Sequence, residues 1–308
     1  MKHYHFNYNE KFKCIAEKCK HNCCIGWDIA IDKKSLDFYK TLEGEDSRFS
    51  TPYLNGKSFT MKNMRCVFLD DDNLCHIIKN YGEKSLCKTC KTHPRFKNFF
   101  TGITETGLGL YCEHACKIIL QQKNKMRLDL IKTDNKPICL SAFEKRVLAF
   151  RKKVINIIQN RKLTLEDRLN ELEQLSKIDL NKITYLEWQD FFNKLEKLPN
   201  NNMSYSIVNK AEGFLPLASE YQLQLEQLLS YLAFRHLSRG IDFLDLNVRL
   251  AFVCLSLKMI NQLFCLAQEQ SLNSLIEVCR FYSAEIETND DNIFNILNKL
   301  ESLITFPI

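Results

Sequence analysis

The residues of this chain best suited to chemistry are its cysteines. Ten of the fourteen lie in the first 116 residues, and four of these fall within one stretch of eleven residues. Such spacing is typical of thiolates that gather around metal. The ten are Cys14, Cys19, Cys23, Cys24, Cys66, Cys75, Cys87, Cys90, Cys112 and Cys116. The other four, which lie in sequence with helical periodicity, are expected to be small buried hydrophobic residues: Cys139, Cys254, Cys265 and Cys279.

Metal binding is favoured over disulfide formation by the start of the chain and by its length. The first seven residues, Met1 to Asn7, contain no apolar stretch of the kind found in signal peptides. Disulfides are rare in the reduced cytosol, and they matter most in small domains that lack a core. A chain of 308 residues with 45% hydrophobic content is not such a domain. We therefore expect a cytoplasmic protein with thiolate–metal chemistry.

The charge and hydropathy of the chain limit the classes of partner. Residues 1–125 contain 21 Lys and Arg against 14 Asp and Glu, so the positive excess lies with the cysteines. This charge would offset an anionic thiolate centre or attract an anionic cofactor. We expect no nucleic-acid partner, because no recognition motif is present. We expect no membrane partner either, because the apolar run at 250–257 is far short of the roughly 18 residues of a span.

The cysteine spacing does not name the metal. Zinc and an iron–sulfur cluster both accept four cysteine ligands. Cys87 and Cys90 have the spacing of a chelating turn. The Cys-x3-Cys-x2-Cys motif of radical enzymes is absent, because Gly26 stands three residues after Cys23. Four histidines accompany the cysteines and are further candidate ligands: His21, His76, His93 and His114.

The pattern of elements predicts a mainly α protein of two parts. Residues 1–125 form a cysteine-rich metal-binding module with short helices and little strand, and residues 126–308 form an all-helical domain, a C-terminal helical bundle. In the first part, weak alternation over 27–31 indicates a short strand, and Asp32 is expected to cap a helix that ends near Leu42. The acidic run at 70–73 is interpreted as a solvated turn, since it lacks the ligand spacing of a calcium loop.

In the second part, capping signals and apolar periodicity predict most of the helices. Ser141, Thr164 and Thr184 each stand three residues before a carboxylate, which is the spacing of a capping box. Two long helices are expected to follow over about 219–239 and 246–270. A last pair is expected over 272–288 and 291–303.

The order of the cysteine motifs resembles the flagellin lysine-N-methylase family, within the wider group of CxxCxxCC zinc- or iron-chelating proteins. The resemblance rests on Cys14, Cys19 and the segments 23–29, 66–69, 74–77, 90–95 and 108–115, with a further match at Tyr231 to Arg235. Tyr111 and His114 depart from the family pattern, which has Ser and Pro near Cys112.

The resemblance implies methylation of flagellin lysines of the bacterial flagellum, with S-adenosyl-L-methionine as donor and a [4Fe-4S] cluster as cofactor. Its metal ligands would be the thiols shared with the family: Cys14, Cys19, Cys23, Cys24, Cys66, Cys75, Cys90 and Cys112. Cys87 and Cys116 stand outside that shared set. The sequence sets no oligomeric state.

Methyl transfer to lysine requires a neutral amine, so a nearby base must take its proton. Asp28 and Glu113, which lie within the matching motifs, are the candidate catalytic carboxylates. Trp27 could face the cationic sulfonium of the donor, and Arg95 could hold its carboxylate. Structural roles for all four remain the alternative, and packing is the expected role of Tyr231 and Arg235. The competing functions are a non-enzymatic zinc-binding structural or interaction protein and a metal-storage protein.

Overall fold

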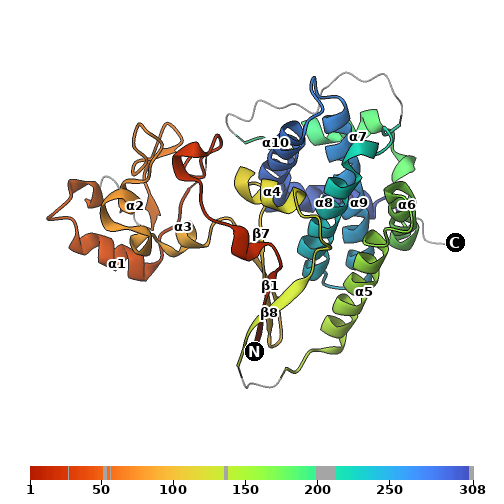
Figure 1. The fold of residues 1–308 in the computed structure, drawn as a ribbon, viewed down its shortest axis with the longest axis horizontal. Coiled ribbons are helices and arrows are strands. Elements are labelled where there is room, and N and C mark those ends of the chain that lie inside the picture. The colour runs from red at the N-terminus through yellow and green to blue at the C-terminus, as the bar shows by residue number, and fades with distance from the viewer. Residues whose placement is uncertain (27, 51–53, 56, 135–137, 199–212, 305–308) are drawn as a thin grey trace.

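The computed structural model describes all residues except 27, 51–53, 56, 135–137, 199–212 and 305–308. Figure 1 shows a small lobe, built from residues 29–92, on the left and a larger helical body on the right. The small lobe carries three short helices, α1 (Lys33–Thr41), α2 (His76–Tyr81) and α3 (Lys88–Thr92). Two hairpins of two-residue strands complete it: β2 (Leu54–Asn55) with β3 (Ser58–Phe59), and β4 (Met61–Lys62) with β5 (Arg65–Cys66).

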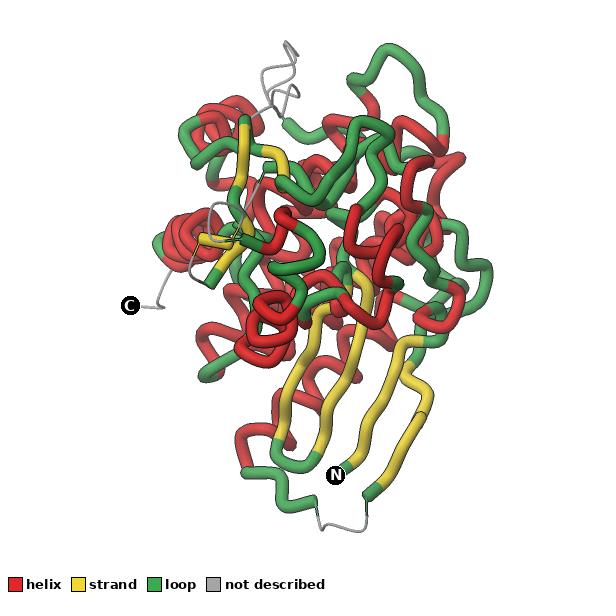
Figure 2. The backbone as a smooth tube through the Cα atoms, turned by 90° about the vertical axis from the view of Figure 1, so that its left-hand side faces the viewer, coloured by secondary structure: helices red, strands yellow, loops and turns green. Residues whose placement is uncertain are grey.

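A four-stranded mixed sheet was not expected from the sequence. Its strands are β1 (Lys2–Phe6), β6 (Arg95–Phe100), β7 (Ile103–Leu108) and β8 (Leu128–Thr133), in the order β6-β7-β1-β8. β1 runs parallel to β7 and antiparallel to β8, and Figure 2 shows the four strands side by side near the N-terminus. The expectation of little strand in the first part was therefore wrong. β8 lies after residue 125, in the part expected to be all-helical, and it pairs with the first strand of the chain, so that expectation was wrong over Leu128–Thr133.

The C-terminal half is helical, as predicted. It contains α5 (Ala142–Ile158), α6 (Leu165–Ser176), α7 (Tyr185–Asn193), α8 (Gln222–His236), α9 (Phe243–Cys265), α10 (Leu272–Tyr282) and α11 (Asp290–Glu301). Ser141 and Thr184 form complete capping boxes, and the Thr164 and Asp32 side chains cap α6 and α1. One π-helical turn, Ser283–Glu287, follows α10.

The described residues form two hydrophobic cores and a third, small cluster of Phe100, Val147 and Leu246. The larger core is built around α8 and α9, and it also takes residues from β1, β7 and α4 (Glu113–Leu120). The smaller core lies in the small lobe, where aromatic rings such as Tyr39, Phe49 and Phe68 pack against one another. Apolar residues from both ends of the first 125 residues thus pack in the body, whereas the middle of this segment has a core of its own.

The structure also bears on the strand expected at 27–31 and on the acidic turn expected at 70–73. Trp27, the first residue of the strand expected at 27–31, lies outside the described residues. The rest of that segment is extended but makes one isolated bridge only, between Ala30 and Ser58. The acidic run is a turn, in which the Asp70 carboxylate accepts the backbone N–H groups of Asp72 and Leu74. None of the described helices is both long and apolar enough to cross a membrane.

Candidate metal centre

Nine of the ten N-terminal thiols form one group in which charge on one thiol raises the pKa of others, and charge on Cys112 also raises the pKa of the tenth, Cys116. Cys23 is central to this group, because its negative charge raises the pKa of thiols from several segments: Cys19, Cys24, Cys66, Cys75, Cys90 and Cys112. Cys87 acts on Cys66, and Cys14 acts on Cys112. The tenth, Cys116, is buried in the body, where its Sγ lies 3.7 Å from the carbonyl oxygen of Ile276. We call the nine the thiol group.

Two pairs of thiols are in hydrogen-bond contact. The Cys24 thiol hydrogen-bonds to Cys23 and lowers the pKa of Cys23, and Cys90 acts in the same way on Cys87. Cys87 is the N-cap residue of α3, and backbone N–H groups at the start of that helix also stabilise its thiolate. Cys87, which stands outside the ligands implied by the family resemblance, therefore lies within the thiol group in space.

Burial raises the pKa of the thiols that take no part in these two pairs. The pKa of Cys66 and of Cys112 rises to about 11, and that of Cys19 rises to about 12, where the Glu113 carboxylate adds to the effect of burial. Among the residues that the structure describes, no three thiol sulfurs lie within 4.8 Å of one another. The group is therefore a set of close pairs and single thiols, and binding a metal would have to displace their protons.

The thiol group divides between the two parts of the molecule. Five thiols pack in or against the core of the small lobe: Cys24, Cys66, Cys75, Cys87 and Cys90. The other four lie on the thiol loop, residues 14–24, and at the start of α4: Cys14, Cys19, Cys23 and Cys112. Cys112 packs against the core of the body. Figure 1 shows the thiol loop, in red, between the small lobe and the helices α4 and α10. We call this place the junction.

Two of the four predicted catalytic and donor-binding residues are found at the junction. Glu113 accepts two backbone hydrogen bonds through Oε2, from Lys20 N at 2.9 Å and from His21 N at 3.1 Å, so its carboxylate fastens the thiol loop to α4. Arg95 stacks its guanidinium on the Phe12 ring, 5.3 Å from the centroid. Asp28 is exposed on the chain that enters the small lobe, and Trp27 lies outside the described residues.

The four candidate histidine ligands have different surroundings. Both ring nitrogens of His76 are engaged, with Asp46 Oδ2 at 2.5 Å and Asn80 Nδ2 at 2.9 Å. Burial lowers the pKa of His93 to about 4, and its ring packs against Tyr111. The His114 ring lies beside Phe12, and His21 Nε2 lies 2.6 Å from Glu277 Oε2. His21 is therefore the histidine of the four that joins the thiol loop to the body.

A buried polar cluster beneath the junction was only partly foreseen. The Tyr231 hydroxyl accepts hydrogen bonds from Arg235 Nη1 and Leu110 N, and it donates to Glu287 Oε2 at 3.1 Å. Glu287 Oε1 lies 2.6 Å from His236 Nε2. The i, i+4 spacing of Tyr231 and Arg235 indicated a shared helix face, but no local pattern marked Glu287, which lies in the π-helical turn.

This cluster extends toward the thiols through Tyr111. The Arg235 guanidinium lies 5.7 Å from the Tyr111 ring centroid, and charges on Cys112 and Cys23 act on the Tyr111 hydroxyl. The pKa of Tyr111 is raised, mainly by burial. Arg235 thus places a permanent positive charge under the junction. Its own pKa is raised, although burial opposes the charge, because Glu287 stabilises it.

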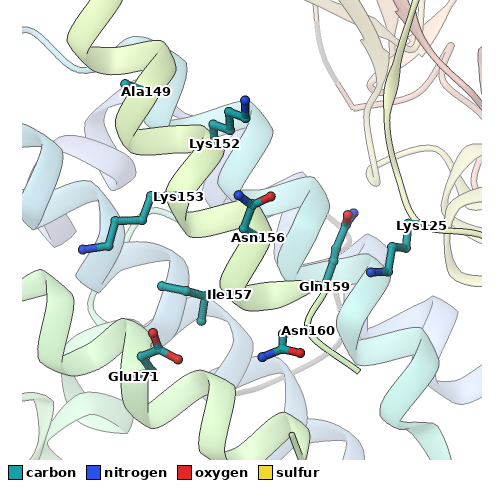
Figure 3. Close-up of a pocket in the computed structure, with 9 residues that line it drawn as sticks. All are labelled: Lys125, Ala149, Lys152, Lys153, Asn156, Ile157, Gln159, Asn160 and Glu171. Atoms are coloured by element: carbon teal, nitrogen blue, oxygen red, sulfur yellow. The ribbon is translucent and has the colours of Figure 1, made fainter. Parts of the chain in front are cut away.

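A groove of about 630 Å³ in the body is a different kind of site. It lies along α5 and α6, and its polar lining includes Lys125, Lys152, Lys153, Asn156, Asn160 and Glu171 (Figure 3). No cysteine lines it. The groove therefore has no part in the thiol chemistry that the sequence predicts.

Comparison with known proteins shows a distant relationship to lysine-N-methylases. The chain is 28% identical over 131 residues to the lysine-N-methylase of Salmonella typhimurium, which covers 38% of this chain and 32% of that protein. The lysine-N-methylase of Salmonella choleraesuis gives the same identity and coverage over 130 residues. The match to the flagellar biosynthetic protein FliU of Salmonella muenchen, also 28% over 130 residues, covers 38% of this chain and 76% of that protein.

The aligned residues thus span about a third of the length of the two lysine-N-methylases. No family model matches the chain, and no solved structure matches it. The chain is therefore distantly similar to lysine-N-methylases and to FliU. Each of these matches covers 38% of this chain.

Proposed function

We propose that this protein is an S-adenosyl-L-methionine-dependent protein-lysine N-methyltransferase that acts on flagellin and carries a cysteine-bound [4Fe-4S] cluster. The observation that carries the proposal is the thiol group. Nine thiols from separate segments, four of them at the junction and five in or against the core of the small lobe, lie near one another in a chain that is distantly similar to lysine-N-methylases and to a flagellar biosynthetic protein.

The four thiols of the junction are the proposed ligands of the cluster: Cys14, Cys19, Cys23 and Cys112. They match the four cysteines that a [4Fe-4S] cluster requires. A cluster also holds its thiolates farther apart than zinc does, because sulfurs around zinc lie about 3.8 Å apart for a Zn–S bond of about 2.3 Å. Among the described residues no three thiol sulfurs lie within 4.8 Å of one another, so the thiols are not already arranged as zinc ligands. When bound, the cluster would supply Lewis-acidic iron beside the site of transfer.

The remaining chemistry is assigned to one exposed carboxylate on the chain that enters the small lobe and to two residues at the junction. We assign proton removal from the substrate lysine to Asp28, because its carboxylate is exposed and can approach a protein substrate. Glu113 is assigned a positioning role, since its Oε2 already holds the thiol loop. Arg95 would hold the donor's carboxylate from its place on Phe12. A role for Trp27 beside the sulfonium stays a prediction from the sequence.

The test is to purify the chain without oxygen, measure iron and sulfide, and follow transfer of a labelled methyl group from S-adenosyl-L-methionine to flagellin. We expect brown protein that absorbs near about 400 nm and transfers methyl groups. Cys23→Ala should lose iron and transfer together. Cys139→Ala, which removes an exposed thiol outside the group, is the matched control and should keep both. Full transfer by iron-free Cys23→Ala protein would contradict a role for the cluster.

A second candidate function is supported by the small lobe. Its core holds eleven buried residues, and five thiols pack in or against it. A core of this size gives limited stability, and small domains often depend on a structural metal. A zinc-binding structural or interaction protein would be colourless, would contain stoichiometric zinc, and would transfer no methyl group in the same assay.

A further inference from the structure

One group of metal-binding side chains at the junction contains no sulfur. A ring nitrogen of His21 and one carboxylate oxygen each from Glu113 and Glu277 all lie within 4.8 Å of one another. The three residues come from the thiol loop, the first turn of α4 and the middle of α10. Segments more than 150 residues apart in the sequence therefore supply one set of nitrogen and oxygen donors.

The positions of these side chains are constrained by other contacts. Glu113 Oε2 accepts the backbone N–H groups of Lys20 and His21, so this carboxylate and the backbone of the thiol loop are held together. His21 Nε2 lies 2.6 Å from Glu277 Oε2. The His21 and Glu277 side chains are 36% and 34% exposed, which leaves room for water on the open side of the group.

The charge of the group favours a cation. Two carboxylates lie within 4.8 Å of each other, and the basic side chains that the structure pairs with them both contact Glu277 Oε2, His21 through Nε2 at 2.6 Å and Arg280 through Nε at 3.4 Å. Like charges at this distance repel each other, and a divalent ion between them would remove the repulsion. Imidazole and carboxylate donors suit first-row divalent ions, which do not require thiolates.

We propose that His21, Glu113 and Glu277 bind a first-row divalent cation at a site separate from the thiol group. Water would complete the coordination on the exposed side. The ion would connect the thiol loop to α4 and α10, and it would therefore fix the loop that carries Cys19 and Cys23 against the body. The proposal does not depend on the methyltransferase assignment, because it concerns nitrogen and oxygen donors alone.

Mn²⁺ is the best probe, because it prefers oxygen and nitrogen ligands and competes poorly for thiolates. The full chain, purified without oxygen, would be titrated with Mn²⁺, and the free ion would be counted by its electron paramagnetic resonance signal. We expect one bound Mn²⁺ per chain and a rise in Tm, since an ion that binds only the folded state stabilises it. Absence of saturable binding would overturn the proposal.

Two variants test which residues hold the ion. Glu277→Gln keeps the shape of the side chain and should weaken Mn²⁺ binding at least tenfold, and His21→Ala should do the same. The control is Asp72→Asn, which changes the acidic turn at 70–72 and should leave binding unchanged. Thiol content and far-ultraviolet circular dichroism should stay as in the wild type. Wild-type affinity in folded Glu277→Gln protein, or loss of binding in Asp72→Asn alone, would show that the ion binds elsewhere.

Discussion

The small lobe and the helical body reach stability by different means. In the body, α8 is buried along most of its length and α9 is surrounded by other helices, so the apolar core accounts for the fold. In the small lobe, the helices have five to nine residues and the core is a set of stacked aromatic rings with thiols at its edge. We therefore expect the body to be stable without metal, whereas the second candidate function, in which a structural metal binds the thiols of the small lobe, predicts that this lobe is not.

The largest expected effect is a difference in response to metal removal. A chelator applied to metal-loaded protein should leave residues 29–92 open to hydrogen exchange, because metal binding and folding are coupled where a core is small. Residues 222–265, in α8 and α9, should keep their protection. Restoring the metal should restore protection in the small lobe. Equal protection of both parts after chelation would contradict the comparison.

The second largest expected effect is a loss of unfolding free energy when the buried ion pair of the body is broken. Arg235→Ala leaves the Glu287 carboxylate buried without its cation, so the free energy of unfolding should fall by about 3–5 kcal/mol. The control is Lys194→Ala, which breaks an exposed ion pair with Asp190 and should change urea unfolding very little. If both variants unfold at the same urea concentration, the buried pair contributes little to the body.

Acid should destabilise the body through His236. Burial lowers the pKa of His236 to about 4, although its contact with Glu287 opposes the shift. In the unfolded chain the pKa is about 6.5, so the unfolded state binds the proton first as the pH falls. Stability should therefore fall between about pH 6.5 and pH 4, by on the order of 3 kcal/mol for this residue. His236→Gln should flatten the curve of unfolding free energy against pH.

His93 should contribute to the same loss of stability in acid, because burial also lowers the pKa of His93 to about 4. The effects of the two histidines must therefore be measured separately. His93→Gln should remove a similar part of the slope, and the double variant should remove more than either single variant. An unchanged slope in both His236→Gln and His93→Gln would show that other groups control the acid response.

The sequence predicted the helices well because their signals are local. Asp32, Ser141, Thr164 and Thr184 each cap a helix at the expected residue. The helix α9 begins three residues before its expected start, because Asp242 is its N-cap, and it ends at Cys265 rather than at 270. Caps and apolar periodicity lie within a few residues of each other, so no distant contact is needed to interpret them.

The sheet was missed because its strands bury polar residues and expose an aromatic one. In β6, Asn98 is 4% exposed and Phe99 is 71% exposed, which reverses the usual alternation. Asn98 is satisfied by the Phe234 carbonyl oxygen, and the buried Glu105 of β7 is paired with Arg151. These partners lie in α8 and α5, so a pattern search within the strands has no means to find them.

The candidate site was predictable in its residue types but not in its arrangement. The cysteine spacing indicated metal binding and marked Cys87 and Cys90 as a chelating turn, whereas the family resemblance left Cys87 outside its ligand set. Its contact with Cys90 and its effect on Cys66 became apparent only in the structure. Glu277 and Glu287 carried no local signal, because their partners His21 and Tyr231 lie far away in the sequence.

The smallest expected change is the loss of stability when one helix cap is removed, and it can be compared between the two parts of the molecule. Ser141→Ala, in the body, removes the cap of α5 and should cost about 1 kcal/mol of unfolding free energy with no effect on metal. Asp32→Ala, in the small lobe, removes the cap of α1 and also the carboxylate that accepts Lys88 N at 2.7 Å. Lys88 directly follows Cys87, so this cap also holds the turn between Cys87 and Cys90.

We therefore expect Asp32→Ala to make the small lobe more sensitive to chelator, in addition to a loss of stability similar to that of Ser141→Ala. The measurement is the chelator concentration at which residues 29–92 lose half of their hydrogen-exchange protection. Asp32→Asn keeps one oxygen acceptor and should show an intermediate value. If the small lobe of Asp32→Ala and that of Ser141→Ala lose protection at the same chelator concentration, the cap of α1 does not act on the turn between Cys87 and Cys90. The two parts of the molecule would then respond alike to the loss of a cap.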